Sequence, residues 1–161
     1  MDSRQYNFSF EAYASADELS KEDAALLQKA RAITANAYAP YSHFNVGAAA
    51  LLANGEIVTG TNQENASFPV GICAERTLLS AVSSLFPNTA IQTMAISYFN
   101  SKGNTSDPIS PCGMCRQALA EYEERTQHPI RLILSGQKGE VLVISSAAQL
   151  LPLSFGKKDL K

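Results

Sequence analysis

The chain has 161 residues, of which 45% are apolar and 17% charged, and its formal net charge is −2. This is the size and balance of one globular domain. No apolar run approaches the ~18 residues of a membrane span, and the 13 Lys and Arg residues are too few and too scattered for the basic patch of a nucleic-acid binder. A small-molecule partner is therefore favoured. The first residues lack the basic and apolar regions of a signal peptide, so we expect a cytoplasmic protein.

The chain begins with a polar and aromatic segment, residues 1–19, which has no sustained period and is expected to be a short strand or an ordered arm. Ser20 then has the character of a helix cap, and apolar residues recur at helical spacing until Pro40. Periodicity and turn signals predict the later segments. They are strands at 46–53, 56–61, 91–99, 130–134 and 141–144, and helices at 74–86, 113–125 and 146–151.

The order of these segments predicts an α/β fold. Strands joined through helices are expected to be parallel neighbours, whereas short links favour antiparallel pairs. Asn54-Gly55 is a strong hairpin signal, and residues 135–140 are too few for a helical crossover. We therefore expect a three-layer α/β/α sandwich, with a mixed, roughly five-stranded sheet and helices on both faces. Residues 20–161 would form this domain and residues 1–19 an N-terminal extension.

The three cysteines exclude a complete disulfide framework, because their number is odd. Cys112 and Cys115 are three residues apart at the start of a predicted helix, so their thiolates lie on one helical turn. Cys73 opens another helix, and both N-termini are expected at the carboxyl edge of the sheet, where their partial positive charge stabilises thiolates. Three sulfur ligands and an open position are typical of a catalytic zinc. Three unrelated buried cysteines are the alternative.

Glu75 follows Cys73 by two residues, in the first turn of the same helix. A carboxylate beside a hydrated zinc can exchange protons with the bound water and with a substrate. The alternative is an acid that only interacts favourably with the helix N-terminus. His43 and His128 are the only histidines, so a fourth protein ligand is not readily available.

Cys73-Ala74-Glu75, followed by Pro111-Cys112-Gly113-Met114-Cys115, is similar to the general zinc-deaminase signature. Further segments resemble the cytidine deaminase family, and within it the enzymes that act on free nucleosides. These segments are residues 41–48, 60–66, 73–77, 112–117 and 150–155. The resemblance covers about residues 20 to 160. It implies the cytidine deaminase-like fold, a homotetramer, and one zinc ion per subunit.

The resemblance also implies a role for each residue that matches the family's motifs. Asn62 and Glu64 would hold the ribose 3′-hydroxyl, and Phe44 would pack beside the nucleoside. The backbone amide of Ala74 would bind the pyrimidine O2, and the carbonyl of Ser110 would accept from the exocyclic amine. The alternatives are turn formation for Asn62, a solvated position for Glu64 and ordinary core packing for Phe44.

Two further positions concern the metal and the assembly. Arg76 matches a residue that hydrogen-bonds the zinc thiolates, where its charge would offset that of a three-thiolate centre; a surface salt bridge is the alternative. Phe155 matches an aromatic that enters a neighbouring subunit's pocket and stacks on the base, and its alternative is a Phe that closes its own core. Phe68 stands where many relatives have Tyr, so any contact made by that hydroxyl is absent.

The predicted reaction, on this resemblance, is hydrolytic deamination of cytidine and deoxycytidine to uridine and deoxyuridine with release of ammonia. Zinc-activated water would attack C4 of the base, and Glu75 would move the protons. Deamination of another free aminopyrimidine or of an aminonucleoside antibiotic stays open. A polynucleotide deaminase is disfavoured by the acidic balance and the terminal hairpin, and a zinc-stabilised module without activity requires a fourth protein ligand.

Overall fold

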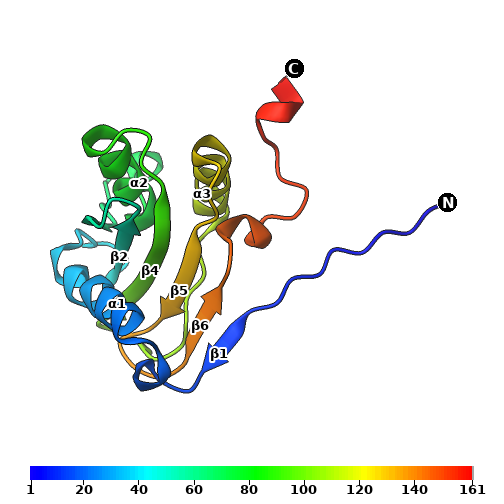
Figure 1. Ribbon diagram of the computed structural model, residues 1–161. Coiled ribbons are helices and arrows are strands. Elements are labelled where there is room, and N and C mark those ends of the chain that lie inside the picture. Colours follow the sequence, from blue (N-terminus) through cyan, green and yellow to red (C-terminus); the bar gives the residue numbers. More distant parts are fainter. Residues whose placement is uncertain (161) are drawn as a thin grey trace.

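The computed structural model describes residues 1–160, and Lys161, the last residue of the predicted domain, lies outside the described residues. Six strands form one mixed sheet in the order β1-β6-β5-β4-β2-β3, and helices cover both faces (Figure 1). The strands are β1 (Glu11–Tyr13), β2 (Phe44–Leu52), β3 (Ile57–Thr61), β4 (Ile91–Asn100), β5 (Arg131–Ser135) and β6 (Val141–Ile144). The α-helices are α1 (Lys21–Ile33), α2 (Ala74–Leu85) and α3 (Gly113–Thr126). The predicted α/β class is confirmed.

The pairing of the strands confirms both predicted hairpins. β2 and β3 are antiparallel around Asn54-Gly55, where Gly55 has φ +85°, a conformation that favours glycine. β5 and β6 are antiparallel, and β4 and β5 are parallel, as expected for strands joined through a helix. The same expectation is wrong for β3 and β4. They run in the same direction, but β2 lies between them and pairs with both, because the hairpin returns β3 to the outer edge of β2.

The sixth strand comes from the N-terminal extension, which adds to the roughly five strands that were predicted. Glu11 pairs with Val143 and Tyr13 with Val141, so β1 covers what would otherwise be the exposed edge of β6. Three residues are too few to show alternation in the sequence, which is why the pattern there was ambiguous. Before β1 the chain extends away from the body (Figure 1). The division of the chain at residue 19 stays a prediction.

Helix α1 begins where the sequence predicts but ends before the predicted end near Pro40. The Ser20 hydroxyl accepts a hydrogen bond from the Asp23 amide at 3.1 Å, which confirms the cap. The helix ends at Ile33 and continues only as a 3₁₀ turn, η2 (Thr34–Asn36), whereas the periodicity ran on towards Pro40. Leu27 and Ala30 of α1 are fully buried against one face of the sheet. The predicted last helix is also shorter, a 3₁₀ turn η4 (Ala147–Leu150).

Helices α2 and α3 cover the opposite face, which completes the predicted three layers. Leu78 and Val82 of α2 and Leu119 of α3 belong to one buried cluster with the sheet. The close approach of α2 depends on Gly60 of β3, since a Cβ there would lie 2.6 Å from the Ala74 carbonyl oxygen and 2.6 Å from the Leu78 nitrogen. The first turn of α2 therefore rests directly on β3. Within residues 1–160, none of the helices has the length and apolar character to cross a membrane.

Candidate active site

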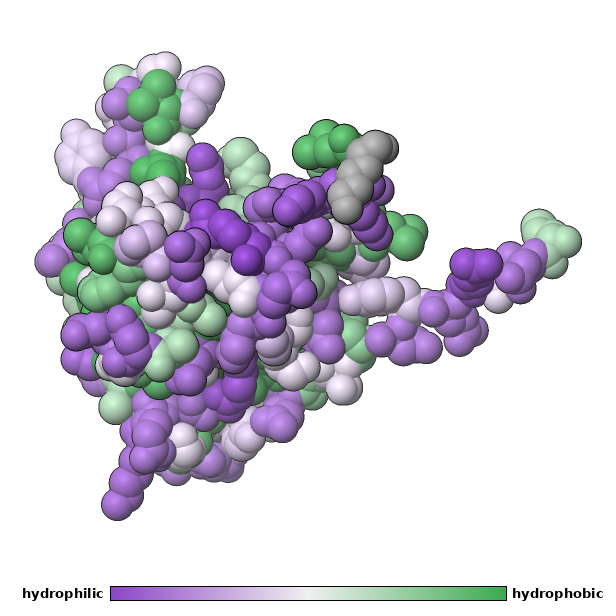
Figure 2. Space-filling view, turned by 45° about the horizontal axis from the view of Figure 1, so that its top comes forward, coloured by the Kyte–Doolittle hydropathy of each residue, from purple (hydrophilic) through white to green (hydrophobic). Residues whose placement is uncertain are grey.

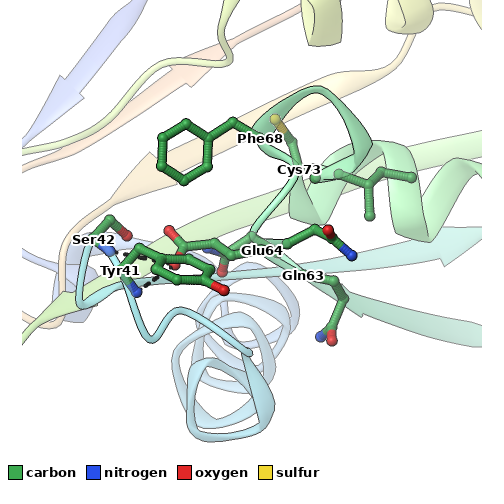
Figure 3. A pocket seen from close by; sticks show the side chains of 10 residues that line it. Tyr41, Ser42, Gln63, Glu64, Phe68 and Cys73 are labelled. Carbon is green, nitrogen blue, oxygen red and sulfur yellow. Dashed lines mark hydrogen bonds between the residues drawn. The ribbon is translucent and has the colours of Figure 1, made fainter.

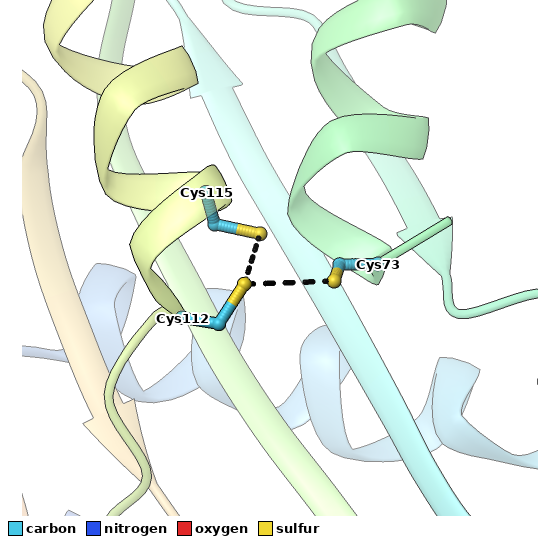
Figure 4. A group of neighbouring side chains, drawn as sticks. All are labelled: Cys73, Cys112 and Cys115. Atoms are coloured by element: carbon cyan, nitrogen blue, oxygen red, sulfur yellow. Dashed lines mark hydrogen bonds between the residues drawn. The ribbon is translucent and has the colours of Figure 1, made fainter. Parts of the chain in front are cut away.

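The three cysteines converge, as predicted, between the N-termini of α2 and α3 (Figure 4). Cys73 is the N-cap residue of α2 and Cys112 that of α3, and neither side chain caps its own helix. The Sγ atoms of Cys73 and Cys112 are 3.8 Å apart, those of Cys112 and Cys115 are 3.5 Å apart, and all three lie within 4.8 Å of one another. Although β2 separates β3 from β4, these strands run the same way, so the helices that follow them begin at the same edge of the sheet.

This geometry fits a tetrahedral zinc ion. Zinc–sulfur bonds of ~2.3 Å in tetrahedral geometry place the sulfurs roughly 3.8 Å from one another, close to the distances between these thiols. Among the residues that the structure describes, no further Cys, His, Asp or Glu joins the group. Three ligands leave one coordination position for water or substrate, which is the arrangement of catalytic sites. The observed donor set therefore does not favour a closed structural zinc module.

The thiols interact strongly even without the metal. The Cys115 thiol, together with the Cys112 thiol and the Arg76 charge, lowers the pKa of Cys73 to about 6, although burial and the Glu75 charge act in the opposite direction. The same interaction raises the pKa of Cys115, which is buried. Amides of the first helical turns have no partner within their helix and carry partial positive charge. Those of α2 and α3 face this cluster, which favours the thiolates that zinc requires.

The Glu75 side chain lies beside the cysteines in a nearly dry position. It is 5% exposed, although it belongs to the first turn of a helix. Burial raises the pKa of the Glu75 carboxyl, while its own backbone amide and the Cys115 thiol oppose this. A raised pKa brings a carboxyl closer to the range in which a general acid–base residue works. A merely favourable acid at a helix N-terminus would be exposed instead.

A cavity of about 330 Å³ opens on Cys73, Cys112 and Glu75. Its walls bring together most of the residues that the sequence singled out. They are Phe44, Asn62, Cys73, Ala74, Glu75, Ser110 and Cys112, with Val46 and Ile109. The Phe44 ring stacks on Tyr98 with centroids 4.7 Å apart, which holds it at the cavity wall. The volume is that of a small-molecule site.

Asn62 and Cys73 line both this cavity and a second one of about 510 Å³. Glu64 lines only the second cavity, together with Tyr41, Ser42 and Phe68 (Figure 3). The Asn62 amide also holds the start of β2, because it donates to the Phe44 carbonyl at 2.9 Å and accepts from the Val46 amide at 2.7 Å. One N–H and one lone pair remain on this amide for a ligand. Asn62 thus supports backbone structure, as its alternative interpretation holds, while it also lines the cavity.

The Glu64 carboxylate accepts hydrogen bonds from the amides of Tyr41 at 2.9 Å and Ser42 at 3.3 Å. Partial burial raises its pKa, but the bonds from Ser42 and from the Tyr41 backbone outweigh this, so the pKa lies below its ordinary value. Phe68 flanks the same cavity with its ring edge-on to Tyr41 and is 75% exposed. A charged acceptor therefore lines the same cavity as two exposed aromatic rings that pack against each other.

Two predicted residues make no direct contact with this site. Phe155 does not line the cavity, and its side chain is 59% exposed on the C-terminal segment, so it does not close its own core. Arg76 is half-buried, and among residues 1–160 its guanidinium has no hydrogen bond to a cysteine sulfur or salt bridge to a carboxylate. Its charge reaches Cys73 only through space.

Arg116 is a residue of the site whose role the sequence interpretation missed. Its side chain donates to the Pro111 carbonyl at 2.9 Å and to the Leu150 carbonyl at 3.0 Å. The first bond secures the turn that carries Cys112, and the second ties this turn to η4. The only signal in the sequence is the position of an Arg directly after Cys115, which does not reveal backbone partners distant in the chain.

The fold and the site define an α/β protein with a catalytic-type zinc centre. The more specific assignment comes from comparison with known proteins. Residues 20–127 match the family model for the cytidine and deoxycytidylate deaminase zinc-binding region. The chain belongs to this family of zinc-dependent deaminases.

Three known proteins match this chain over nearly their whole length. The cytidine deaminase of Halalkalibacterium halodurans is 33% identical, with 84% of this chain and 95% of the relative covered. The cytidine deaminase of Sporosarcina psychrophila is 36% identical, with 84% and 92% covered. Among solved structures, a cytidine deaminase from Burkholderia pseudomallei superposes with a TM-score of 0.71 at 35% identity, covering 85% of this chain and 100% of that one.

Proposed function

We propose that this chain catalyses the hydrolytic deamination of cytidine and deoxycytidine to uridine and deoxyuridine, with release of ammonia. The observation that carries the proposal is the junction of three thiols within 4.8 Å and the buried Glu75 at one small cavity. The family and its relatives named cytidine deaminase support the same reaction. The cytoplasmic location expected from the first residues stays a prediction.

Cys73, Cys112 and Cys115 would hold the zinc ion, which when bound lowers the pKa of water towards ~7 and so supplies a nucleophile. Glu75 accepts the proton from this water and delivers it to N3 of the base, which makes C4 electrophilic. The oxygen of this water then bonds to C4 and still carries one proton. Glu75 takes that second proton and passes it to the amine, so that the C4–N bond breaks, ammonia leaves and the C4 carbonyl of uridine forms. Its burial supports both tasks, because a carboxyl with a raised pKa gives and takes protons readily.

The cavity walls offer a partner for each polar group of the nucleoside. The Ala74 amide is a first-turn amide without a helical partner and would donate to the pyrimidine O2. The Ser110 carbonyl, which precedes Pro111, would accept from the exocyclic amine. The remaining N–H of Asn62 and the Glu64 carboxylate would hold the ribose 3′-hydroxyl, and Phe44 would pack beside the nucleoside. Arg76, half-buried near Cys73, would offset the negative charge of the metal centre.

We further propose that the protein is a homotetramer in which Phe155 of one subunit completes the pocket of another and stacks on the base. Phe155 and Leu153 are exposed on the C-terminal segment, where Figure 2 shows hydrophobic side chains projecting from the body. Phe68 and Tyr41, at the rim of the larger cavity, are also exposed. Two such apolar regions on one chain support an association that buries both.

The test is an ultraviolet assay of cytidine conversion combined with metal analysis. We expect activity with one zinc per subunit, loss of activity with a chelator, and recovery with added zinc. A panel of substrates separates the open alternatives. If the chain is a cytidine deaminase, a substrate without the ribose 3′-hydroxyl should be turned over much more slowly than cytidine. If it is a deaminase of free bases, removal of this hydroxyl should not change the rate. Stoichiometric zinc without turnover of any aminopyrimidine would contradict the proposal.

A further inference from the structure

The C-terminal segment that carries Phe155 is tied to α3 at three points. Arg116 donates to the Leu150 carbonyl at 3.0 Å, at the root of the segment. The Gln117 side-chain amide donates to the Phe155 carbonyl at 2.9 Å. About two helical turns further along α3, the Glu124 carboxylate accepts from the Lys157 amide at 3.4 Å. The segment therefore runs along α3 and is attached to it by hydrogen bonds.

Between the first two attachments the chain takes an unfavourable path. Leu153 has φ +56°, a left-handed conformation that a branched, non-glycine residue seldom adopts, and its side chain is fully exposed. Such a conformation persists only where the surroundings impose it. No packing of the Leu153 side chain imposes it here, which leaves the attachments at Leu150 and Phe155 as its cause.

From these contacts we infer that Gln117 is a positioning residue for Phe155. Its bond to the Phe155 carbonyl holds the backbone against α3, so that the ring projects away from its own chain, ready to enter the pocket of another subunit. This inference rests on the proposed role of Phe155. Gln117 lies two residues after Cys115. The same turn of α3 would therefore carry a zinc ligand for the pocket of its own subunit and position the Phe155 ring for the pocket of another subunit.

The test uses Gln117→Met in the full-length, zinc-loaded protein. Methionine matches glutamine in length and helix propensity, adds no charge near the cysteines, and cannot donate to the carbonyl. Gln28→Met, at an exposed position of α1, is the matched control. The readouts are zinc content, hydrogen–deuterium exchange of the amides of residues 151–160, and KM and kcat for cytidine, each also measured with Phe155→Ala.

We expect Gln117→Met to keep its zinc and to accelerate exchange in the C-terminal segment. Loss of one hydrogen bond corresponds to a rise in KM of about two- to tenfold, with kcat nearly unchanged. Phe155→Ala should raise KM by roughly 5- to 150-fold if the ring stacks on the base. Because Gln117 acts only through Phe155, adding Gln117→Met to Phe155→Ala should raise KM no further. The control should match the unaltered protein.

The outcomes distinguish a failure of the positioning role of Gln117 from a failure of the proposed stacking role of Phe155. Unchanged exchange in Gln117→Met, or an equal rise in KM in the presence and absence of Phe155, overturns the positioning role. If Phe155→Ala leaves KM unchanged while Gln117→Met still accelerates exchange, Gln117 does hold the segment, and it is the stacking role of Phe155 that fails.

Discussion

Substituting Gly60 by Ala is the most direct way to disturb the site without touching a residue that would meet substrate or metal. The new Cβ would lie 2.6 Å from the Ala74 carbonyl oxygen and from the Leu78 nitrogen, both backbone atoms of α2. An ordinary Cβ contact begins at 3.4 Å, so α2 would have to move by about 0.8 Å. Overpacking of this kind costs about 1–3 kcal/mol.

The same movement displaces Cys73, which precedes Ala74, relative to the two cysteines of α3. Zinc–sulfur distances tolerate only ~0.2 Å, so a shift of this size cannot leave the three-sulfur geometry intact. We expect Gly60→Ala to lower the urea midpoint of unfolding and to weaken zinc binding by about tenfold or more, the scale of losses when the support of metal ligands is removed.

Urea unfolding of the zinc-loaded protein and competition with a chelator measure the two effects separately. Gly113→Ala is the matched control, because it adds the same methyl group directly after Cys112, where no atom outside the adjacent residues and the backbone of α3 lies within 4 Å. It should leave both quantities unchanged or stabilise the helix slightly. If Gly60→Ala binds zinc as tightly as the unaltered protein, the close packing of α2 on β3 does not set the metal geometry.

Four further predictions follow from the structure. Glu75→Gln should lower kcat by roughly 10³–10⁴-fold with zinc content unchanged; near-normal turnover would show that Glu75 does not carry the protons. A chelator should remove activity and also lower the thermal midpoint, because bound metal stabilises the folded state, and an unchanged midpoint would argue against metal held by the core. Glu123→Leu should destabilise by about 1–3 kcal/mol in urea, since the buried Ile130 amide loses its acceptor and the Ala147 amide keeps only the Ile130 carbonyl; Glu123→Gln, which keeps an acceptor oxygen, should lose much less. Deletion of residues 1–13 should promote aggregation seen by light scattering, because it uncovers β6, whereas deletion of residues 1–5 retains β1 and should have no such effect.

Much of the site could be predicted from the sequence because its signals are local. Cys112 and Cys115 lie on one helical turn whatever the rest of the chain does, and Glu75 lies in the first turn of the helix that Cys73 opens. The Asn54-Gly55 hairpin and the Ser20 cap likewise depend on neighbours within a few residues. Such features are determined by backbone preferences and periodicity alone.

Other features required the tertiary structure. The position of β2 between β3 and β4 depends on which strand edges pair. The addition of β1 to the sheet depends on the free edge of β6, which lies more than 100 residues later in the chain. Arg116 and Gln117 bind carbonyl oxygens, and every residue offers one, so no side-chain pattern marks their partners.

The amino-acid sequence by itself determined the three cysteines of the candidate metal site, the acid beside them and the α/β class, because residue type and short-range spacing set these. Only the tertiary structure decided that the three sulfurs meet at 3.5 and 3.8 Å, that Glu75 is buried, and that Phe155 is exposed and does not line the cavity of its own chain. Distances and burial arise from the packing of α2 and α3 on the sheet, where contacts between residues far apart in the chain outweigh local preference.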